Sequence, residues 1–250
     1  DEGSSHADRD QQFQYINEKV KLFQSQGNPV LSVDTKKKEN IGNYKNNGKE
    51  YRPKGNPRAV KVYDFIDKNR GKVAPYGIYD MTLNKGWVSV GISSDTAEFA
   101  VNSIRSWWYE MGQEHYSKAS EIFINADGGG SNGYRVRLWK TELQKLANEL
   151  GKSIHISHFP PGTSKWNKIE HKMFCFITSN WRAKPLIDRA TVVNLIANTK
   201  TKNGLIIKAK LDTNSYQKKI KISNEELAKI NITKSDFHGE WNYIIHPLKN

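Results

Sequence analysis

Three acidic residues stand where a folded chain could bring their carboxylates together. Asp34 ends the apolar run at residues 31–33, Asp127 ends the run at 122–126, and Glu170 opens a predicted helix behind a Pro-Pro turn. Converging carboxylates repel one another unless a cation holds them, and hard oxygen ligands with room for water suit magnesium or manganese. The chemistry to consider is therefore that of a divalent metal ion held by acids.

Each acid also has an ordinary structural explanation. An aspartate at a strand end commonly closes the strand through an Asx turn. Asn167 and Glu170 have the spacing of a capping box at a helix start. Phe174, Ile177 and Trp181 follow this glutamate at i+4, i+7 and i+11, which would place its carboxylate at the head of an apolar stripe. A carboxylate directed toward a core needs a partner.

The composition points to a polyanionic partner. The 250-residue chain carries a net charge of +13, which favours nucleic acid first and a membrane surface second. No basic amphipathic helix, membrane-length apolar run or signal-peptide core is apparent, so we expect no membrane association and a location in the cytosol of a bacterial or archaeal cell. The single cysteine, Cys175, excludes an internal disulfide and is predicted to be an inert core thiol, since its neighbours are apolar.

Hydrophobic patterning predicts an alternation of strands and helices. A short helix is expected around residues 13–23. Asp80 is a competing acid, but its place beside a predicted hairpin turn favours a structural role. The predicted strands cover residues 29–34, 73–81, 87–93, 121–126, 153–159, 205–210, 220–222 and 241–246, and the later helices cover 94–112, 133–150, a segment ending at 181, and 190–197.

Three motifs resemble those of a known family. The segments SVDTKKKE, NADGGGSNGYR and HFPPGTSKWNKIEH carry the three acids. They resemble the DDE transposases of the Rhodopirellula-type insertion sequences, which have an RNase H-like catalytic domain, and FPPGTSKWNKIE is more distantly similar to the mariner-like enzymes. The likeness runs from about residue 8 to residue 247. Members normally carry a helix-turn-helix region before this part, and nothing here resembles one.

The resemblance implies an α/β RNase H-like fold with a mixed five-stranded sheet flanked by helices. We expect a polar N-terminal segment with a short helix at residues 1–28, a catalytic domain at 29–185 with a basic insertion at 35–72, and a C-terminal extension at 186–250 that packs on it. In that topology strands 29–34 and 121–126 are parallel neighbours. Asp34 and Asp127 would then lie side by side, with Glu170 beside them.

The same resemblance implies the reaction. Two Mg²⁺ or Mn²⁺ ions could clamp the attacking and leaving oxygens of a phosphodiester. Asp34 would bridge the ions, and Asp127 and Glu170 would each complete one. The expected activity is cleavage at transposon ends and transfer of the 3′-hydroxyl into target DNA, by a homodimer or higher assembly. The alternatives are a non-transposing nuclease of the same fold and a domesticated, non-catalytic DNA-binding protein.

The basic insertion is the first candidate for contacts with DNA. Residues 36–72 hold nine lysines and three arginines against four acids, with Tyr44, Tyr51 and Tyr63 interleaved. Such a surface suits phosphates and bases, although a solvated, flexible insertion is the alternative. The residues predicted to contact DNA are Lys36, Lys37, Lys38, Lys45, Lys49, Arg52, Lys54, Arg58, Lys165 and Lys168.

Two other readings find little support. His155, His158 and His171 lack the spacing of a metal site. The glycines at 128–130 lack the Gly-Lys-Ser/Thr ending of a phosphate-binding loop. The sequence therefore supports neither a histidine metal site nor a nucleotide-binding loop.

Overall fold

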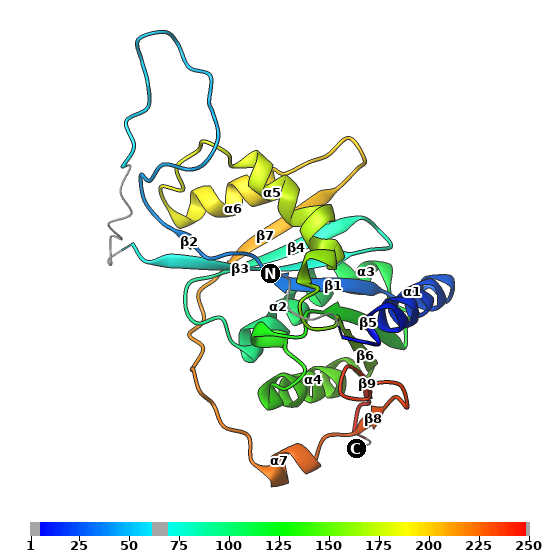
Figure 1. Ribbon diagram of the computed structural model, residues 1–250. Helices are drawn as coiled ribbons and strands as arrows, with labels where there is room; N and C mark the ends of the chain where they lie inside the picture. The colour runs from blue at the N-terminus through cyan, green and yellow to red at the C-terminus, as the bar shows by residue number, and fades with distance from the viewer. Residues whose placement is uncertain (1–5, 62–69, 249–250) are drawn as a thin grey trace.

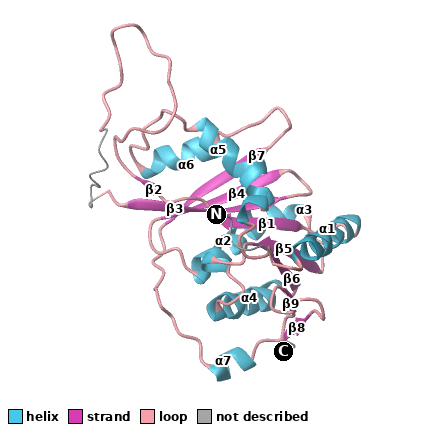
Figure 2. Ribbon diagram, in the orientation of Figure 1, coloured by secondary structure: helices cyan, strands magenta, loops and turns pink. Residues whose placement is uncertain are grey.

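A mixed β-sheet flanked by helices forms the centre of the molecule (Figures 1 and 2). The computed structural model describes residues 6–61 and 70–248. The strands lie in the order β7-β4-β3-β1-β5-β6-β9-β8, and β2 pairs with β3. Their bounds are β1 Val30–Thr35, β2 Glu39–Asn40, β3 Lys72–Asp80, β4 Lys85–Gly91, β5 Glu121–Ala126, β6 Ser153–His158, β7 Ile206–Asp212, β8 Ile232–Lys234 and β9 Asn242–Ile245.

The helices lie between these strands in the chain. The α-helices are α1 Arg9–Ser25, α2 Ala97–Trp107, α3 Gln113–His115, α4 Arg137–Leu150, α5 Cys175–Asn180, α6 Arg189–Ala197 and α7 Asn224–Ala228. A π-helical turn at Trp108–Gly112 joins α2 to α3, and a second at Glu170–Phe174 leads into α5. Short 3₁₀ turns occupy Gly130–Asn132 and Ser164–Trp166. No described helix has both the length and the apolar character needed to cross a membrane.

The five central strands have the arrangement that the resemblance implied. β3 pairs antiparallel with both β1 and β4, whereas β5 is parallel to β1 and to β6. This order, with α2 and α4 as the crossovers, confirms the RNase H-like fold. The expected count of five strands was wrong, because β7 extends one edge, β9 and β8 extend the other, and β2 pairs with β3. The patterning marks a strand but not its partner, since pairing depends on distant packing.

The chain after α6 reaches both edges of the sheet. β7 pairs in parallel with β4, and β9 pairs antiparallel with β6. Figure 1 shows the segment between them running along the outside of the molecule from β7 to α7. Residues 220–222, predicted as a strand, lie in this segment without strand structure. They are apolar enough to suggest a strand, but they precede the capping box of Ser223 and Glu226 that begins α7.

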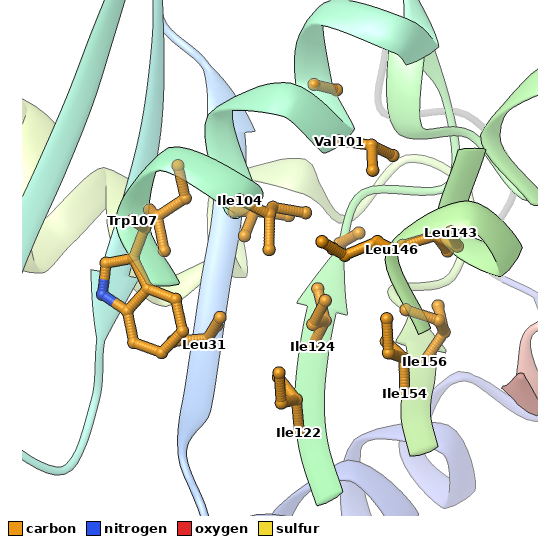
Figure 3. Close-up of a cluster of buried hydrophobic side chains, with 14 of the residues drawn as sticks. Leu31, Val101, Ile104, Trp107, Ile122, Ile124, Leu143, Leu146, Ile154 and Ile156 are labelled. Carbon is orange, nitrogen blue, oxygen red and sulfur yellow. The ribbon is translucent and has the colours of Figure 1, made fainter. Parts of the chain in front are cut away.

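Helices α2 and α4 cover one face of the sheet. Figure 3 shows Ile104 and Trp107 of α2 and Leu146 of α4 directed toward Leu31 and Ile124 of the central strands, and all five side chains are buried. The opposite face is covered by α1 at β1 and β5, and by the helix from Glu170 to Asn180 together with α6 at β3 and β4. The sheet is thus a middle layer, and alternate residues of each strand face different helices.

The helix from Glu170 to Asn180 buries the predicted stripe. Phe174, Ile177 and Trp181 are each about 2% exposed or less. Cys175 is exposed, so the prediction of a core thiol was wrong. Its position one residue after Phe174 turns it away from the stripe, because successive helical residues point about 100° apart.

The basic insertion leaves the sheet after β2. Figure 1 shows that the described part of the insertion, residues 41–61, extends away from the body of the molecule. Tyr44 and Lys61 form an isolated bridge at its base, and Tyr51 is fully exposed. Tyr63 lies outside the described residues.

We predict that Gly77→Ala destabilises the protein. Gly77 pairs with Asp34 across β1 and β3, and an added Cβ would lie 2.5 Å from Cε1 of Phe174 and 2.7 Å from Cε of Met173. Because both neighbours are buried, the helix must move away or the side chains must leave their rotamers, at a cost of about 1–3 kcal/mol. Denaturant unfolding measures the change.

Gly129→Ala is the matched control, because an added Cβ there would meet nothing within 4 Å and its backbone is extended. Equal stability of the two variants would show that the helix does not need the glycine beneath it.

Candidate active site

Parallel pairing of β1 with β5 brings two of the predicted acids together. The register aligns Val33 with Ala126. Asp34 and Asp127 are the next residues in the chain, so they lie at the same end of the sheet. Ser32 and Asn125 precede them on the same face by the two-residue alternation of a strand. The face opposite to α2 and α4 therefore carries both carboxylates.

Glu170 comes from the helix that covers this face. It begins the π-helical turn Glu170–Phe174, and such turns are frequent at functional sites. The backbone N–H of Ile169 donates to the hydroxyl of Ser32 at 2.9 Å, which fixes the helix start against β1. The charge of Glu170 raises the pKa of both Asp34 and Asp127. All three predicted acids thus lie in one electrostatic cluster.

Asn167 connects the elements that carry the acids. Its amide nitrogen donates to Oδ1 of Asp127 at 2.9 Å and to the carbonyl of Val33 at 3.2 Å, and its carbonyl oxygen accepts from the hydroxyl of Ser32. The side chain is completely buried. The predicted capping box was therefore wrong, because the amide bonds to β1 and Asp127 instead of to its own helix.

No sequence motif predicts this role of Asn167. A polar residue just before an apolar helix favours a cap, and only the docking of the helix on β1 reveals the other partners. The one signal in the sequence is that Asn167 lies three residues before Glu170. Its hydrogen-bond partners lie on or directly after β1 and β5, far away in the chain.

The carboxylates are held in a state that disfavours their charge. Burial, followed by the charge of Asp127, raises the pKa of Asp34 to about 8, although the N–H of Thr35 donates to its Oδ1 at 2.7 Å. Burial also raises the pKa of Asp127 to about 6, against the opposite effect of the Asn167 hydrogen bond. Burial raises the pKa of Glu170, while the charge of Lys36 lowers it. Added positive charge would relieve this cluster.

A cavity of about 890 Å³ opens beside Asp34 and Asp127. Gly128, Gly129 and Gly130 form part of its wall, and an added Cβ at either of the last two would meet no heavy atom within 4 Å. These glycines therefore leave open space next to the acids. The cationic residues that line the cavity are Lys36, Lys37, Lys38 and Arg135.

Two charged residues that line this cavity, Asp95 and Arg135, were not among the predicted site residues. Asp95 lines it, accepts from the hydroxyl of Thr35 at 3.2 Å and contributes to the raised pKa of Asp34. Asp95 directly precedes the cap of α2, Thr96, whose hydroxyl accepts from the N–H of Phe99 at 3.3 Å. Arg135 follows the glycines by five residues, a spacing that in itself predicts nothing.

The predicted DNA-contact residues fall into different surroundings. Lys36 is buried: its ammonium lies 3.7 Å from Oε1 of Glu39 and 4.6 Å from the ring centre of Trp181. Burial lowers its pKa. The remaining residues are exposed: Lys37, Lys38, Lys45, Lys49, Arg52, Lys54, Arg58, Lys165 and Lys168.

The histidines and Asp80 have structural partners. His155 lies 2.9 Å from Glu121, and Nε2 of His171 lies 2.5 Å from the carbonyl of Lys165. Buried His158 contacts the carbonyl of Asp127 through Nδ1 and the hydroxyl of Tyr243 through Nε2, at 2.9 and 3.0 Å. Asp80 accepts from Thr82 N–H and Leu83 N–H at the hairpin turn, at 2.9 and 3.1 Å.

Through these contacts His158 links the backbone at Asp127 to Tyr243 of β9. Burial lowers its pKa to about 4, so the ring is neutral at pH 7. Trp139 Nε1 donates to the same Tyr243 hydroxyl at 3.0 Å, which extends the contact into α4. The sequence singled out this histidine, but as a weak metal candidate.

The acid cluster fits divalent cations in its donors and its charge. Its ligands are carboxylate oxygens, which magnesium and manganese prefer, and its raised pKa values show charge in need of compensation. Among the described residues, the one group of three His, Cys, Asp or Glu side chains with ligand atoms all within 4.8 Å of one another lies elsewhere. The three acids are therefore spread more widely than the ligands of a single compact ion site.

Comparison with known structures finds transposases. The chain is similar to a Mos1 transposase paired-end complex with left transposon end, with 11% identity, a TM-score of 0.47, and coverage of 76% of this chain and 53% of that chain. A Mos1 mariner paired-end complex with Mn has 12% identity, a TM-score of 0.46 and coverage of 76% and 53%. A pre-cleavage Mos1 transpososome has 11% identity, a TM-score of 0.49 and coverage of 76% and 54%.

The chain spans about half of the length of these transposase chains. No curated protein matches its sequence. The family model described as the Rhodopirellula transposase DDE domain matches residues 1–247. This match covers nearly the whole sequence and includes all three acids, and the chain therefore belongs to the Rhodopirellula transposase DDE domain family.

Proposed function

We propose that the protein cleaves phosphodiester bonds at transposon ends and transfers the resulting 3′-hydroxyl into target DNA. The carrying observation is the parallel register of β1 and β5, which sets Asp34 beside Asp127 under the helix that begins with Glu170. Membership of the family supports the reaction class. The proposed catalytic domain spans residues 29–185 and carries the basic insertion at 35–72, and residues 1–28 and 186–250 are proposed as its N-terminal segment and C-terminal extension.

Asp34, Asp127 and Glu170 are proposed to hold two divalent cations, magnesium in the cell and manganese as a substitute. Asp34 would contact both ions, whereas Asp127 and Glu170 would each contact one. Such ions stabilise charge on the attacking and leaving oxygens of a phosphodiester displacement.

The protein's own groups orient these ligands. Asn167 fixes one oxygen of Asp127, and the N–H of Thr35 fixes one oxygen of Asp34. Lys37, Lys38 and Arg135 give the cavity positive charge that can bind phosphate groups. Water is the proposed nucleophile of cleavage, and the DNA 3′-hydroxyl is the nucleophile of strand transfer, so no covalent enzyme intermediate is required.

DNA is the proposed partner, as in the paired-end complexes of Mos1. The exposed cations of the basic insertion, with Lys165 and Lys168, form the proposed contact surface. We further propose that the active species is a homodimer or a higher assembly that holds two transposon ends, and that it acts in the cytosol of a bacterial or archaeal cell.

In metal-free protein we expect Asp34 to make stability fall as pH rises. The folded pKa near 8 lies above the ordinary value of 3.8, so between these values the unfolded chain loses the proton first, and each pH unit favours unfolding by up to about 1.4 kcal/mol. Below this window the penalty is absent, and above pH 8 it is constant. Urea unfolding with EDTA between pH 5 and pH 9 measures it.

Asp34→Asn removes this ionisation. At pH 8 the variant should be more stable than wild type by more than about 1 kcal/mol, and the difference should shrink toward pH 5. Asp236→Asn, at an exposed position, is the control and should follow wild type. Parallel curves for wild type and Asp34→Asn would contradict the buried charge cluster.

Loss of any one acid should abolish strand cleavage and joining. Asp34→Ala, Asp127→Ala and Glu170→Gln each remove a proposed ligand, and combining them should add little, since residues that act as one unit fail together. Mn²⁺-dependent nicking of a plasmid that bears the transposon ends measures cleavage, and sequencing of products measures joining. Circular dichroism checks that the variants fold.

Asp236→Asn should nick DNA as wild type does, because its carboxylate is exposed and remote in sequence from the acids. If an acid variant keeps activity within about tenfold of wild type, the substituted residue is not a ligand. A tenfold loss corresponds to about 1.4 kcal/mol of transition-state stabilisation.

DNA affinity should fall steeply with salt. Neutralisation of about six phosphates gives a slope near −5 in a plot of log binding constant against log salt concentration. Lys37→Ala with Lys38→Ala should reduce the magnitude of that slope by about 2, because both lysines line the cavity beside the acids.

Lys21→Ala with Lys118→Ala makes the charge-matched control, since neither residue lines that cavity and both are exposed. Fluorescence anisotropy with a labelled duplex at several salt concentrations gives the slopes. An equal change in both double variants would mean that binding reports net charge alone.

A further inference from the structure

We propose that His6, Asp8 and His238 form a second metal site, which binds a transition metal ion such as Zn²⁺. The ligand atoms of these three side chains all lie within 4.8 Å of one another, which holds for no other group of this kind among the described residues. Two ligands come from the chain just before α1, and the third precedes β9. A bound ion would therefore join the N-terminal segment to the C-terminal extension.

The distances suit a shared ion. Oδ2 of Asp8 lies 2.9 Å from Nε2 of His238 and 3.9 Å from Nδ1 of His6. Zinc–ligand bonds of 2.0–2.2 Å in tetrahedral geometry separate neighbouring ligand atoms by about 3.3–3.6 Å. The observed separations bracket this range, so small rotations of the three side chains would complete the geometry. A water molecule would be the fourth ligand.

The two imidazoles are oriented for this role. Nδ1 of His238 lies 2.9 Å from Oε1 of Glu240, so a proton on that nitrogen can donate a hydrogen bond to the carboxylate and leave the lone pair of Nε2 for the ion. This carboxylate–histidine arrangement is the usual support of a metal-binding imidazole. Nδ1 of His6 accepts a hydrogen bond from the N–H of Asp8 at 3.2 Å, so it carries a lone pair, and a bound ion would take the place of that hydrogen bond.

The surrounding structure holds the two segments together before any ion arrives. The amides of Gln12 and Asn242 exchange hydrogen bonds of 2.9 and 2.8 Å in the buried interface of α1 with β9. The ring of Trp241 stacks on His238 with centroids 4.2 Å apart, and it meets His6 edge-on at 4.9 Å. Part of the cost of ordering the ligands is therefore already met by folding.

The donor set selects the metal. Two imidazole nitrogens and one carboxylate suit zinc and neighbouring transition metals, whereas magnesium prefers oxygen ligands and near-octahedral geometry. This contrasts with the all-carboxylate cluster of Asp34, Asp127 and Glu170. The two sites should therefore be filled by different ions when both are supplied.

The competing explanation is a metal-free ion-pair cluster. In it, protonated His238 would lie between Asp8 and Glu240, at 2.9 Å from each, and zinc would add nothing. The two explanations make opposite predictions for metal retention by the folded chain.

The experiment measures bound zinc in the Asp34→Asn background, so that the acid cluster does not contribute. Protein is mixed with Zn²⁺ in excess Mg²⁺ and desalted, and metal is counted by atomic emission. We expect about one zinc ion per chain, a higher melting temperature than with Mg²⁺ alone, and the visible absorption of tetrahedral cobalt when Co²⁺ replaces Zn²⁺.

Three variants test the ligands. His6→Ala and His238→Asn should each lose the bound zinc and the cobalt absorption, and asparagine is chosen because His238 has a φ of 46°, which asparagine tolerates. Glu240→Gln should weaken zinc binding by about 10–100-fold. His115→Asn, at an exposed histidine outside the cluster, is the control and should retain the ion.

The proposal is overturned if the parent chain retains no zinc, or if His6→Ala and His238→Asn retain as much as His115→Asn. Should His238→Asn fail to fold, His6→Ala decides, because His6 lies on an exposed segment. DNA cleavage plays no part in these measurements, so failure here leaves the proposed function untouched.

Discussion

The pairing of β1 with β5 in one register is the constraint on which the rest of this molecule depends. It aligns Val33 with Ala126 and so places Asp34 next to Asp127, two like charges that a fold without function would keep apart. The neighbouring structure moderates this repulsion without removing it. Asn167 and the N–H of Thr35 each donate to one carboxylate, while burial keeps the pKa of both acids high.

The approach of the third acid depends on what the sheet lacks. Gly77 pairs with Asp34, and Gly86 lies on the next strand; an added Cβ at Gly86 would come within 2.3 Å of the sulfur of Met173. The missing side chains let the helix of Glu170 lie directly on β3 and β4. Ser32 then receives the N–H of Ile169, so the helix start is fixed against the same strand that carries Asp34. Close packing and polar contacts thus locate one carboxylate relative to the other two.

Much of this arrangement could be predicted from the sequence, because it is written in local patterns. Residues 121–126 form a short, mostly apolar run, and Phe174, Ile177 and Trp181 have helical spacing, so a buried strand and the buried face of a helix could be predicted. The meeting of Asp34 with Asp127 needed a topology, which the family resemblance supplied. The role of Asn167 was beyond reach, since the partners of its buried amide lie far away in the chain. The strand β8 was missed because its three residues, Ile232–Lys234, are too few to show an alternating pattern.

The two edges of the sheet have a consequence for how the chain matures. β4 pairs with β7 and β6 pairs with β9, and both partners come late in the chain. The edges of β4 and β6 therefore expose unpaired backbone groups until residues 206–245 have left the ribosome. Contacts of such long sequence separation form slowly. During synthesis both edges of the sheet therefore stay unpaired until late, and exposed strand edges at this stage favour aggregation.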